Sequence, residues 1–273
     1  MAFDYVGDIN ENGMVARVAT APGAMIPSGQ SDFTWSNKMF RHSLPLVVAI
    51  LWGLAMSGVN ATRPATAADE PAADWVSLFN GKDLAGWITG PDKSWLVVDG
   101  VITLQRTFDG KEHNSDYLWT ENAYGNFILE LEFKVPEQAN SGVFLRTSDL
   151  KDPVYTGIEV QVANSFGRPT LNRGGTAGAI YDCLAPTKNA IRRPGDWNQY
   201  RITCRDSVIQ VMLNGEAIID MDLDQWKQLG QNPDGSPNKF SRPLKDFARK
   251  GHIGLQDHGR PVWYRNIRIQ SLD

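Results

Sequence analysis

Acidic and polar side chains recur at every second position of three apolar segments, and they are the residues best suited to chemistry on a sheet face. They are Glu130, Glu132, Arg146, Glu159 and Gln161. If the three segments are neighbouring antiparallel strands, as consecutive strands commonly are, one face carries all five side chains. An arginine beside two carboxylates lowers the pKa of at least one of them and fixes its orientation. A solvated sheet surface with charges of both signs is the alternative.

A polar turn between two apolar segments carries a histidine. Gln256, Asp257 and His258 follow one another near the carboxyl end, where a histidine is most often exposed and without a chemical role. Because imidazole titrates near neutral pH, His258 could instead act as an acid or a base at the rim of a sheet. No spacing of His, Cys, Asp and Glu matches a standard metal set. The sequence therefore predicts no cofactor and no metal site, although His258 with nearby carboxylates leaves a divalent metal open.

Familiar short catalytic motifs are missing from the sequence. It contains no G-x-x-x-x-G-K-[ST] phosphate loop, no H-E-x-x-H zinc motif and no G-x-S-x-G nucleophile elbow. Any catalysis must therefore come from side chains that strands and turns bring together.

The composition favours some partners over others. The formal net charge is −4 and the pI is about 5.6, so there is no basic footprint for nucleic acid or an anionic membrane. Nine tryptophans and seven tyrosines suit stacking on sugar rings, and they equally suit a well-filled β core. No feature of the sequence points to a protein partner.

Short apolar segments separated by turn residues dominate the second half of the chain. Asp99-Gly100 and Asn214-Gly215 each join two such segments and predict type I′ hairpins. The predicted strands are 94–98, 101–105, 127–135, 142–147, 156–163, 178–181, 198–204, 207–213, 216–221, 252–256 and 262–269. Only 223–229 is typical of a short helix, and 230–240 of a surface loop. The pattern predicts an all-β fold, an antiparallel sandwich or jelly roll.

The amino-terminal part has the anatomy of an export signal. Residues 39–67 contain a short basic start, an apolar core from Leu44 to Met56 and the small residues Ala65-Thr66-Ala67, as a secretory signal peptide does. The apolar core is shorter than the ~20 residues of a membrane span, so no stable anchor is expected after cleavage. We expect residues 1–38 to be a spurious extension, 68–73 a linker and 74–272 one folded domain. Its location would be periplasmic or extracellular.

The two cysteines have two open interpretations. In an oxidising compartment Cys183 and Cys204 could form a disulfide, which would stabilise the fold by roughly 3 kcal/mol in the chain-entropy model. The alternative is a pair of buried free thiols.

Several segments together resemble one known family. They are SLFNGKDLAGW, LWTENAYGNFILELEFKVPEQANSGVFLR, YTGIEVQV, GAIYDCLAPTKNAIRRPGDWNQYRI, VMLNGEAIID and GHIGLQDHGRPVWYRNIRI. In this order they resemble the 3-keto-disaccharide hydrolase domain, over residues 74–272. The resemblance implies a concanavalin A-like jelly roll of two antiparallel sheets. It also implies an exported bacterial hydrolase that acts on glycosidic bonds of 3-keto sugars.

A 3-keto sugar suggests a route to glycosidic cleavage that the strand faces could serve. The ketone acidifies the C2 proton, so a base can remove it, the C1 substituent can leave, and water can then add. We assign Glu159 as base, Arg146 as enolate stabiliser and His258 as acid or base. The predicted substrate-binding residues are Glu132, Gln161, Gln256, Tyr181 and Trp119, the last two as sugar platforms.

A non-catalytic carbohydrate-binding module is the main rival to an enzyme, because jelly rolls host both roles. A structural or adhesive surface domain is a third reading. The clustering of ionisable groups favours the enzyme, with a sugar as its partner.

Overall fold

The computed structural model describes residues 74–91, 93–104 and 116–273. The predicted export signal, the extension and the linker lie outside these residues. The strands are β1 Val76–Ser77, β2 Trp87–Ile88, β3 Trp95–Val98, β4 Val101–Leu104, β5 Leu118–Tyr124, β6 Phe127–Lys134, β7 Asn140–Thr147, β8 Ile158–Ala163, β9 Trp197–Arg205, β10 Val208–Leu213, β11 Glu216–Asp222, β12 Gly251–Leu255 and β13 Val262–Ser271. The helical elements are α1 Pro153–Thr156 and two 3₁₀ turns, Leu223–Gln225 and Leu244–Asp246.

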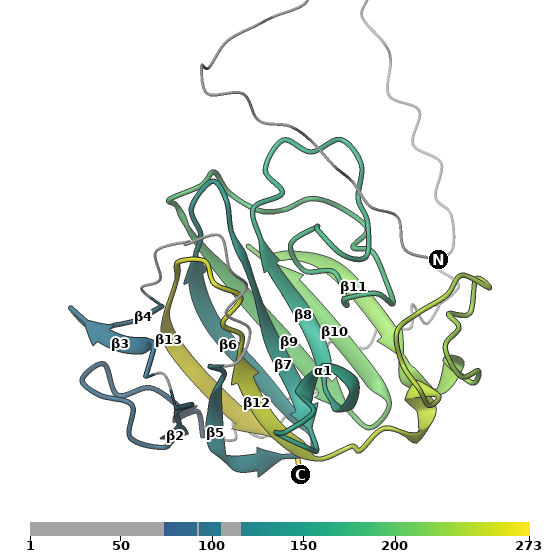
Figure 1. Cartoon of the computed structure of the whole chain (residues 1–273), viewed down its shortest axis with the longest axis horizontal. Coiled ribbons are helices and arrows are strands. Elements are labelled where there is room, and N and C mark those ends of the chain that lie inside the picture. Colours follow the sequence, from purple (N-terminus) through teal and green to yellow (C-terminus); the bar gives the residue numbers. More distant parts are fainter. Residues whose placement is uncertain (1–73, 92, 105–115) are drawn as a thin grey trace, which may run out of the picture. The chain divides into compact units, whose positions relative to one another are not determined.

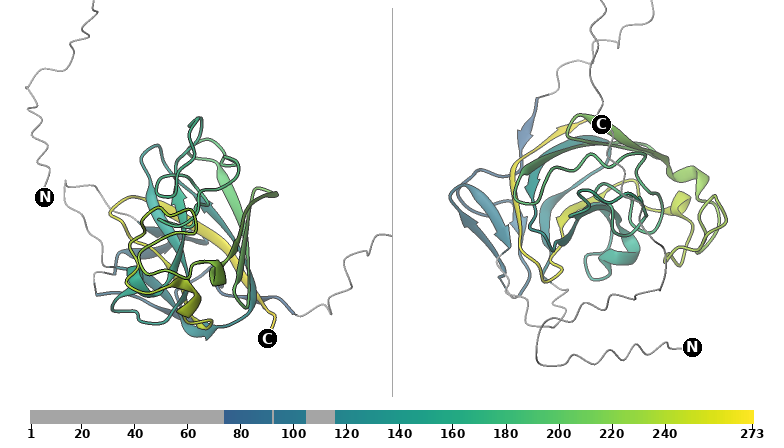
Figure 2. Two further views of the ribbon diagram at one scale, coloured as in Figure 1. Left: turned by 90° about the vertical axis from the view of Figure 1, so that its right-hand side faces the viewer. Right: turned by 90° about the horizontal axis from the view of Figure 1, so that it is seen from above.

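The strands form two antiparallel sheets that are layered face to face (Figures 1 and 2). The eight-stranded sheet has the order β11-β10-β9-β6-β13-β4-β3, with β1 paired to β13. The five-stranded sheet has the order β2-β5-β12-β7-β8. This arrangement confirms the predicted all-β jelly-roll sandwich.

The core lies between the two sheets because apolar residues alternate with polar ones along the strands. On β6, Leu129, Leu131 and Phe133 are fully buried against the other sheet, while the intervening residues face outward. On β8, Val160 and Val162 fill the same core. Each such side chain contributes about 1.5–3 kcal/mol when it leaves water, and this fixes which face of each strand points out.

Among the predictions of single turns, strands and helices, some are confirmed and others are not. Both hairpin turns are confirmed, since Asp99, Gly100, Asn214 and Gly215 all have the positive φ that a type I′ turn requires. Strand β5 was missed, and the predicted strand 178–181 is reduced to isolated bridges at Ile180. The predicted helix 223–229 is only a 3₁₀ turn over its first three residues.

Of the two interpretations of the cysteines, the structure has the pair of buried free thiols and not the disulfide. Cys183 and Cys204 are free and buried, packed as small apolar side chains in the core. Burial raises the pKa of both thiols to about 12, so neither thiol is reactive.

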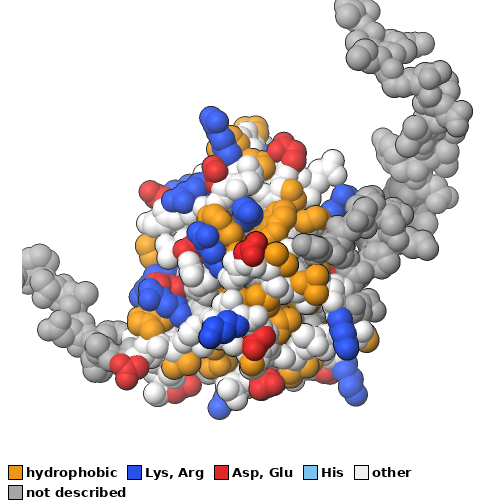
Figure 3. Space-filling model, turned by 90° about the vertical axis from the view of Figure 1, so that its left-hand side faces the viewer, with side chains coloured by type: hydrophobic (Ala, Val, Ile, Leu, Met, Phe, Trp, Pro, Cys, Tyr) orange, Lys and Arg blue, Asp and Glu red, His pale blue; other side chains and the backbone are white. Residues whose placement is uncertain are grey.

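The face of the described part that Figure 3 shows has no single dominant character, because Lys and Arg are interspersed there with Asp, Glu and hydrophobic side chains. Among the described residues, no helix has both the length and the apolarity to cross a membrane.

Candidate active site

The outer face of the five-stranded sheet carries a pocket. On β8, Ile158 and Val160 point into the core, so Glu159 between them points out of the sandwich. A cavity of about 250 Å³ opens there. Its lining residues are Tyr117, Asn140, Val154, Glu159, Tyr181, Lys239, Gln256, Asp257 and His258. Strands β7 and β8 supply Asn140 and Glu159, α1 supplies Val154, and the other lining residues lie in loops, three of them directly after β12.

Glu159 is a buried carboxylate at the base of this pocket. Only 6% of its surface is exposed. It fits against the sheet because Gly142 on β7 has no side chain: a Cβ there would stand 2.5 Å from Oε1 of Glu159. Burial raises the pKa of Glu159 to about 7, against the smaller opposing effects of Lys239 and a hydrogen bond from Gln256. A carboxylate with this pKa can exchange a proton near neutral pH.

Lys239 provides a positive charge in the same pocket. Its backbone N–H donates to the Asp182 carboxylate at 2.6 Å, and its ammonium lies 4.6 Å from the centre of the Tyr181 ring. Burial lowers the pKa of Lys239, and the negative charge of Glu159 acts in the opposite direction. The pocket therefore holds both a buried carboxylate and a partly desolvated ammonium, whose opposite charges attract each other.

Aromatic rings form a small apolar cluster beside Glu159. Tyr117 stacks on Trp119 with ring centres 5.2 Å apart, and Phe144 meets both rings edge-on. Trp119 lies flat on the sheet because Gly254 leaves room for it: a Cβ there would stand 2.1 Å from the indole. Tyr117 is the member of this cluster that lines the pocket, and Trp119 supports it from below.

Gln256 links the carboxylate to the aromatic cluster. Its amide lies close enough to Glu159 to lower the pKa of that carboxylate, and its Nε2 donates to the Tyr117 hydroxyl at 3.4 Å. Burial raises the pKa of Tyr117 to about 12, so this hydroxyl stays protonated. Within the described structure, the buried Oε1 of Gln256 has no hydrogen-bond partner. Because a buried acceptor without a partner is costly, a ligand hydroxyl would be well placed to satisfy it.

Two tyrosines from the other sheet hold the floor of the site from inside the core. The Tyr200 hydroxyl donates to the backbone oxygen of Gln161 at 2.7 Å. The Tyr264 hydroxyl lies 2.8 Å from the Ser141 hydroxyl, which donates to the backbone oxygen of Gln256. Because burial raises the pKa of both tyrosines, both remain protonated. These bonds cross the sandwich and fix β7, β8 and the start of the His258 turn relative to one another.

Known proteins resemble this chain in sequence and in fold. Residues 74–270 match the family described as the 3-keto-alpha-glucoside-1,2-lyase-like domain. The chain belongs to this family. A curated member, a 3-keto-disaccharide hydrolase from Bacteroides thetaiotaomicron, is 28% identical over 231 residues, which cover 74% of this chain and 80% of the relative.

Crystal structures of related proteins share the fold. A candidate glycosyl hydrolase from Parabacteroides distasonis is 35% identical with a TM-score of 0.64, over 73% of this chain and 100% of that one. A second from the same species is 26% identical with a TM-score of 0.57, over 73% and 94%. The family resemblance seen in the sequence is confirmed. Family and relatives support the prediction of a carbohydrate hydrolase that acts on glycosidic bonds.

The structure brings four of the predicted residues of this family member into one pocket. Glu159, His258, Gln256 and Tyr181 all line it. Trp119 lies one layer below and is 5% exposed. Gln161 shares the outer face of β8, but its side chain binds the backbone oxygen of Gly174 and holds the neighbouring loop rather than the pocket.

The prediction that Arg146 shares a face with Glu159 is wrong. Arg146 is buried, and its guanidinium donates to the backbone oxygens of Gly125 and Asp206 and to the side chain of Asn126. Its backbone has a positive φ of 51°, at a point where β7 and β12 lose register. Such an irregularity interrupts the alternation of side chains along a strand and redirects this one.

The placement predicted for Glu132 is also wrong. Glu132 lies on β6 in the eight-stranded sheet, where it binds Arg265 and Asn266. The chain crosses to the other sheet between β6 and β7, so these consecutive strands are not neighbours. Glu132 therefore faces away from Glu159, on the opposite outer surface of the sandwich.

Three residues of the pocket were not predicted from the sequence. Lys239 lies in a polar loop and is brought to the site by contacts with residues almost sixty positions earlier. Tyr117 precedes Trp119 at a spacing of two, which is a strand signal that could have identified it. Asn140 opens β7 and carries no distinctive pattern.

No group of three or more His, Cys, Asp and Glu side chains with metal-binding geometry occurs in the described part of the chain.

Proposed function

We propose that this protein cleaves the glycosidic bond of 3-keto glycosides by removal of the C2 proton, loss of the C1 substituent and addition of water. The observation that carries the proposal is Glu159, a buried carboxylate with its pKa raised to about 7 in a pocket that also holds Lys239. The family is named for a 1,2-lyase of a 3-keto glucoside, and the curated relative for a 3-keto-disaccharide hydrolase. Both names fit this chemistry.

In the first step, ionised Glu159 takes the proton from C2. The electron pair of the broken C2–H bond moves toward the C3 ketone, and negative charge develops on its oxygen. Lys239 replaces Arg146 in the role of stabilising that charge, since its ammonium lies in the pocket. Electrostatic stabilisation of this kind commonly contributes a factor of about 10²–10³ in kcat.

In the second step, the enolate returns its electron pair and the C1–O bond breaks. The leaving oxygen needs a proton, and His258 at the rim of the pocket is assigned to donate it. Water then adds its oxygen to C1 and gives one proton back to His258, and Glu159, whose bound proton exchanges with solvent, returns a proton to C2. One water is consumed, and the products are a 3-keto sugar and the released alcohol.

The decisive experiment compares a 3-keto glucoside with its unoxidised parent in deuterated water. We expect release of the alcohol from the 3-keto glucoside alone, with deuterium entering at C2. Glu159→Gln should abolish both signals. Glu132→Gln is the matched control, because this glutamate lies on the other face, and it should keep wild-type turnover. Saturable binding without turnover of either compound would instead identify a carbohydrate-binding module.

We also propose that the mature protein is exported, with residues 39–67 as its signal peptide. Sequencing the amino terminus of protein recovered from the periplasm or medium tests this. A mature start close to residue 68 supports the proposal, and protein that stays in the cytoplasm at full length contradicts it.

A further inference from the structure

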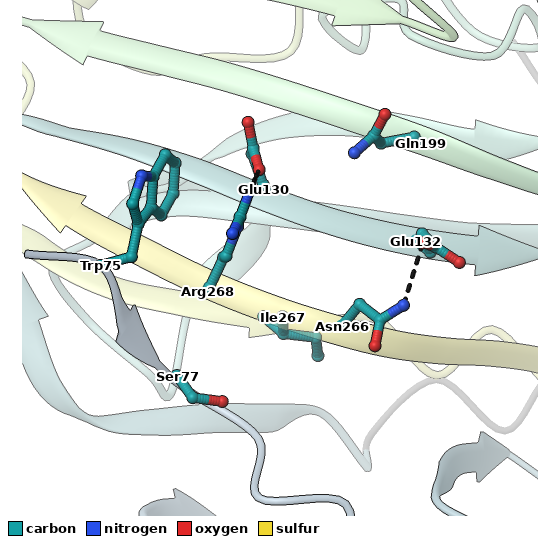
Figure 4. Close-up of a pocket in the computed structure, with 8 residues that line it drawn as sticks. All are labelled: Trp75, Ser77, Glu130, Glu132, Gln199, Asn266, Ile267 and Arg268. Carbon is teal, nitrogen blue, oxygen red and sulfur yellow. Dashed lines mark hydrogen bonds and ion pairs between the residues drawn. The ribbon is translucent and has the colours of Figure 1, made fainter.

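A second cavity lies on the opposite outer surface of the sandwich and is independent of the proposed reaction. It measures about 480 Å³ and opens on the eight-stranded sheet (Figure 4). Its lining residues are Trp75, Ser77, Glu130, Glu132, Gln199, Asn266, Ile267 and Arg268. They come from β1 and the residue before it, from β6, β9 and β13.

Two irregular features shape this cavity. The short strand β1 pairs with the end of β13 and thereby carries Trp75 over the sheet. Strand β13 has a register shift between Arg265 and Arg268, and Asn266 within it has a positive φ of 51°. Such bulges redirect side chains and are frequent beside functional sites. Here the bulge turns the Asn266 amide toward Glu132, to which it donates at 2.9 Å.

Both carboxylates of the cavity are paired with arginine side chains, two carboxylates with three guanidinium groups. Glu130 accepts hydrogen bonds from both Arg201 and Arg268, and Glu132 accepts from Arg265. These partners lower the pKa of both carboxylates and hold them ionised. A paired charge offers little net attraction to an ion, so a neutral ligand is favoured, and the one surplus guanidinium makes an anion the rival ligand. What remains is a floor of fixed, planar hydrogen-bonding groups.

Trp75 adds an apolar wall to this polar floor. The guanidinium of Arg268 lies 4.5 Å from its ring centre and that of Arg201 lies 5.7 Å away, so cation–π contacts hold the indole in place. The side-chain amide of Gln199 faces the cavity and has no hydrogen-bond partner among the described residues. A flat apolar surface beside this amide and the paired carboxylate and guanidinium groups suits a ligand with both C–H faces and many hydroxyls.

The same pattern continues along the sheet. Trp197 and Trp263 stand on either side of Lys134 on three adjacent strands, each ring about 5 Å from the ammonium. Lys134 lies four residues beyond Glu130 on β6, which is roughly 13 Å at 3.3 Å per residue. The aromatic and polar surface is therefore long enough for several sugar rings. Protein interfaces usually exclude charge from their centre, so a protein partner fits this charged floor less well.

We propose that this outer face is a second carbohydrate-binding site, which holds a neutral oligosaccharide chain while the pocket on the other sheet carries out the reaction. Trp75 stacks on one ring of the chain, and Gln199 and Arg268 bond its hydroxyls.

Isothermal titration of the full chain with cellohexaose and with maltohexaose tests the proposal. We expect saturable binding of at least one hexasaccharide. Trp75→Ala should weaken it about tenfold, equivalent to ~1.4 kcal/mol, and Gln199→Ala should weaken it measurably. Glu159→Gln, in the other pocket, should bind like the wild type. Turnover of a small 3-keto glucoside by the Trp75 and Gln199 variants should be unchanged, which also shows that they fold.

Three results would overturn the proposal. They are the absence of binding to both hexasaccharides, equal binding by the wild type and the Gln199→Ala variant, and binding only to an anionic polymer such as polygalacturonate that is lost on adding salt. Because binding is measured without a 3-keto substrate, failure here leaves the proposed reaction intact. Failure of the reaction would likewise leave this site intact.

Discussion

Replacing Glu159 by glutamine should make the protein more stable at alkaline pH while it abolishes the proposed reaction. The carboxylate is almost fully buried, and burial raises its pKa from 4.5 to about 7 despite the nearby Lys239. The other ionisable groups that line the pocket are Tyr117, Tyr181, Asp257 and His258. Keeping a charge in this site therefore costs folding free energy, and a neutral amide of the same shape avoids that cost.

The magnitude follows from the two pKa values. Below about pH 4.5, Glu159 is protonated in both the folded and the unfolded chain, so it adds no pH dependence. Between 4.5 and 7 the folded chain holds the proton and the unfolded chain does not, so the free energy of unfolding falls as pH rises. At about 1.4 kcal/mol per unit, the total loss is roughly 3 kcal/mol and is complete above pH 7. The Glu159→Gln variant has no carboxyl group to ionise here, so its free energy of unfolding does not fall for this reason.

Urea unfolding at about pH 4 and about pH 8 measures the effect. The stability of Glu159→Gln relative to the wild type should rise by roughly 3 kcal/mol between the two pH values. Glu132→Gln is the matched control with the opposite sign, because Asn266 and Arg265 lower the pKa of Glu132. Its removal should cost stability at the higher pH. A Glu159→Gln difference that is the same at both pH values would show that Glu159 is not a desolvated carboxylate.

Three further variants test the other parts of the pocket. Gly142→Ala places a Cβ 2.5 Å from the Glu159 carboxylate and should lower kcat about 10²-fold with the fold intact; wild-type kcat would mean that the carboxylate position is unimportant. Lys239→Gln should lower kcat by about 10²–10³ and move the kinetic pKa of Glu159 upward, because Lys239 opposes the rise in that pKa; an unmoved pH profile would contradict this contact. Arg146→Gln should lower the melting temperature, since it loses three hydrogen bonds, yet keep the wild-type kcat of folded protein.

Local pattern was enough to predict the fold class and the orientation of single strands. The alternation around Glu159 correctly placed it on an outer face, because apolar residues on both sides must enter the core. Hairpin turns were also predictable, since Asn-Gly and Asp-Gly pairs accept the positive φ values that they require. These features depend on neighbours in the sequence, and the physics that fixes them acts over a few residues.

The composition of the site was less predictable because it depends on which strands are neighbours. Alternation places Glu132 and Glu159 on outer faces, and it does not say whether the two faces are the same. The crossing between β6 and β7 separates them. The position of Arg146 was predicted wrongly for a different reason, because the irregular backbone at this residue cannot be recognised in the sequence. Lys239 was not predicted because its loop is held at the pocket by contacts with Asp182 and Tyr181, which are distant in the sequence.

The pocket depends on two glycines of the sheet, which have no side chain, as well as on the side chains that line it. The outer face of a sheet normally exposes its charges, yet Glu159 is buried there because Gly142 leaves a space across the neighbouring strand. Gly254 makes the corresponding space for Trp119, which in turn supports Tyr117 beside the carboxylate. Gly142, diagonally across from Glu159, and Gly254, opposite Trp119, therefore leave the space in which the carboxylate and the indole are buried, and this burial raises the pKa of Glu159.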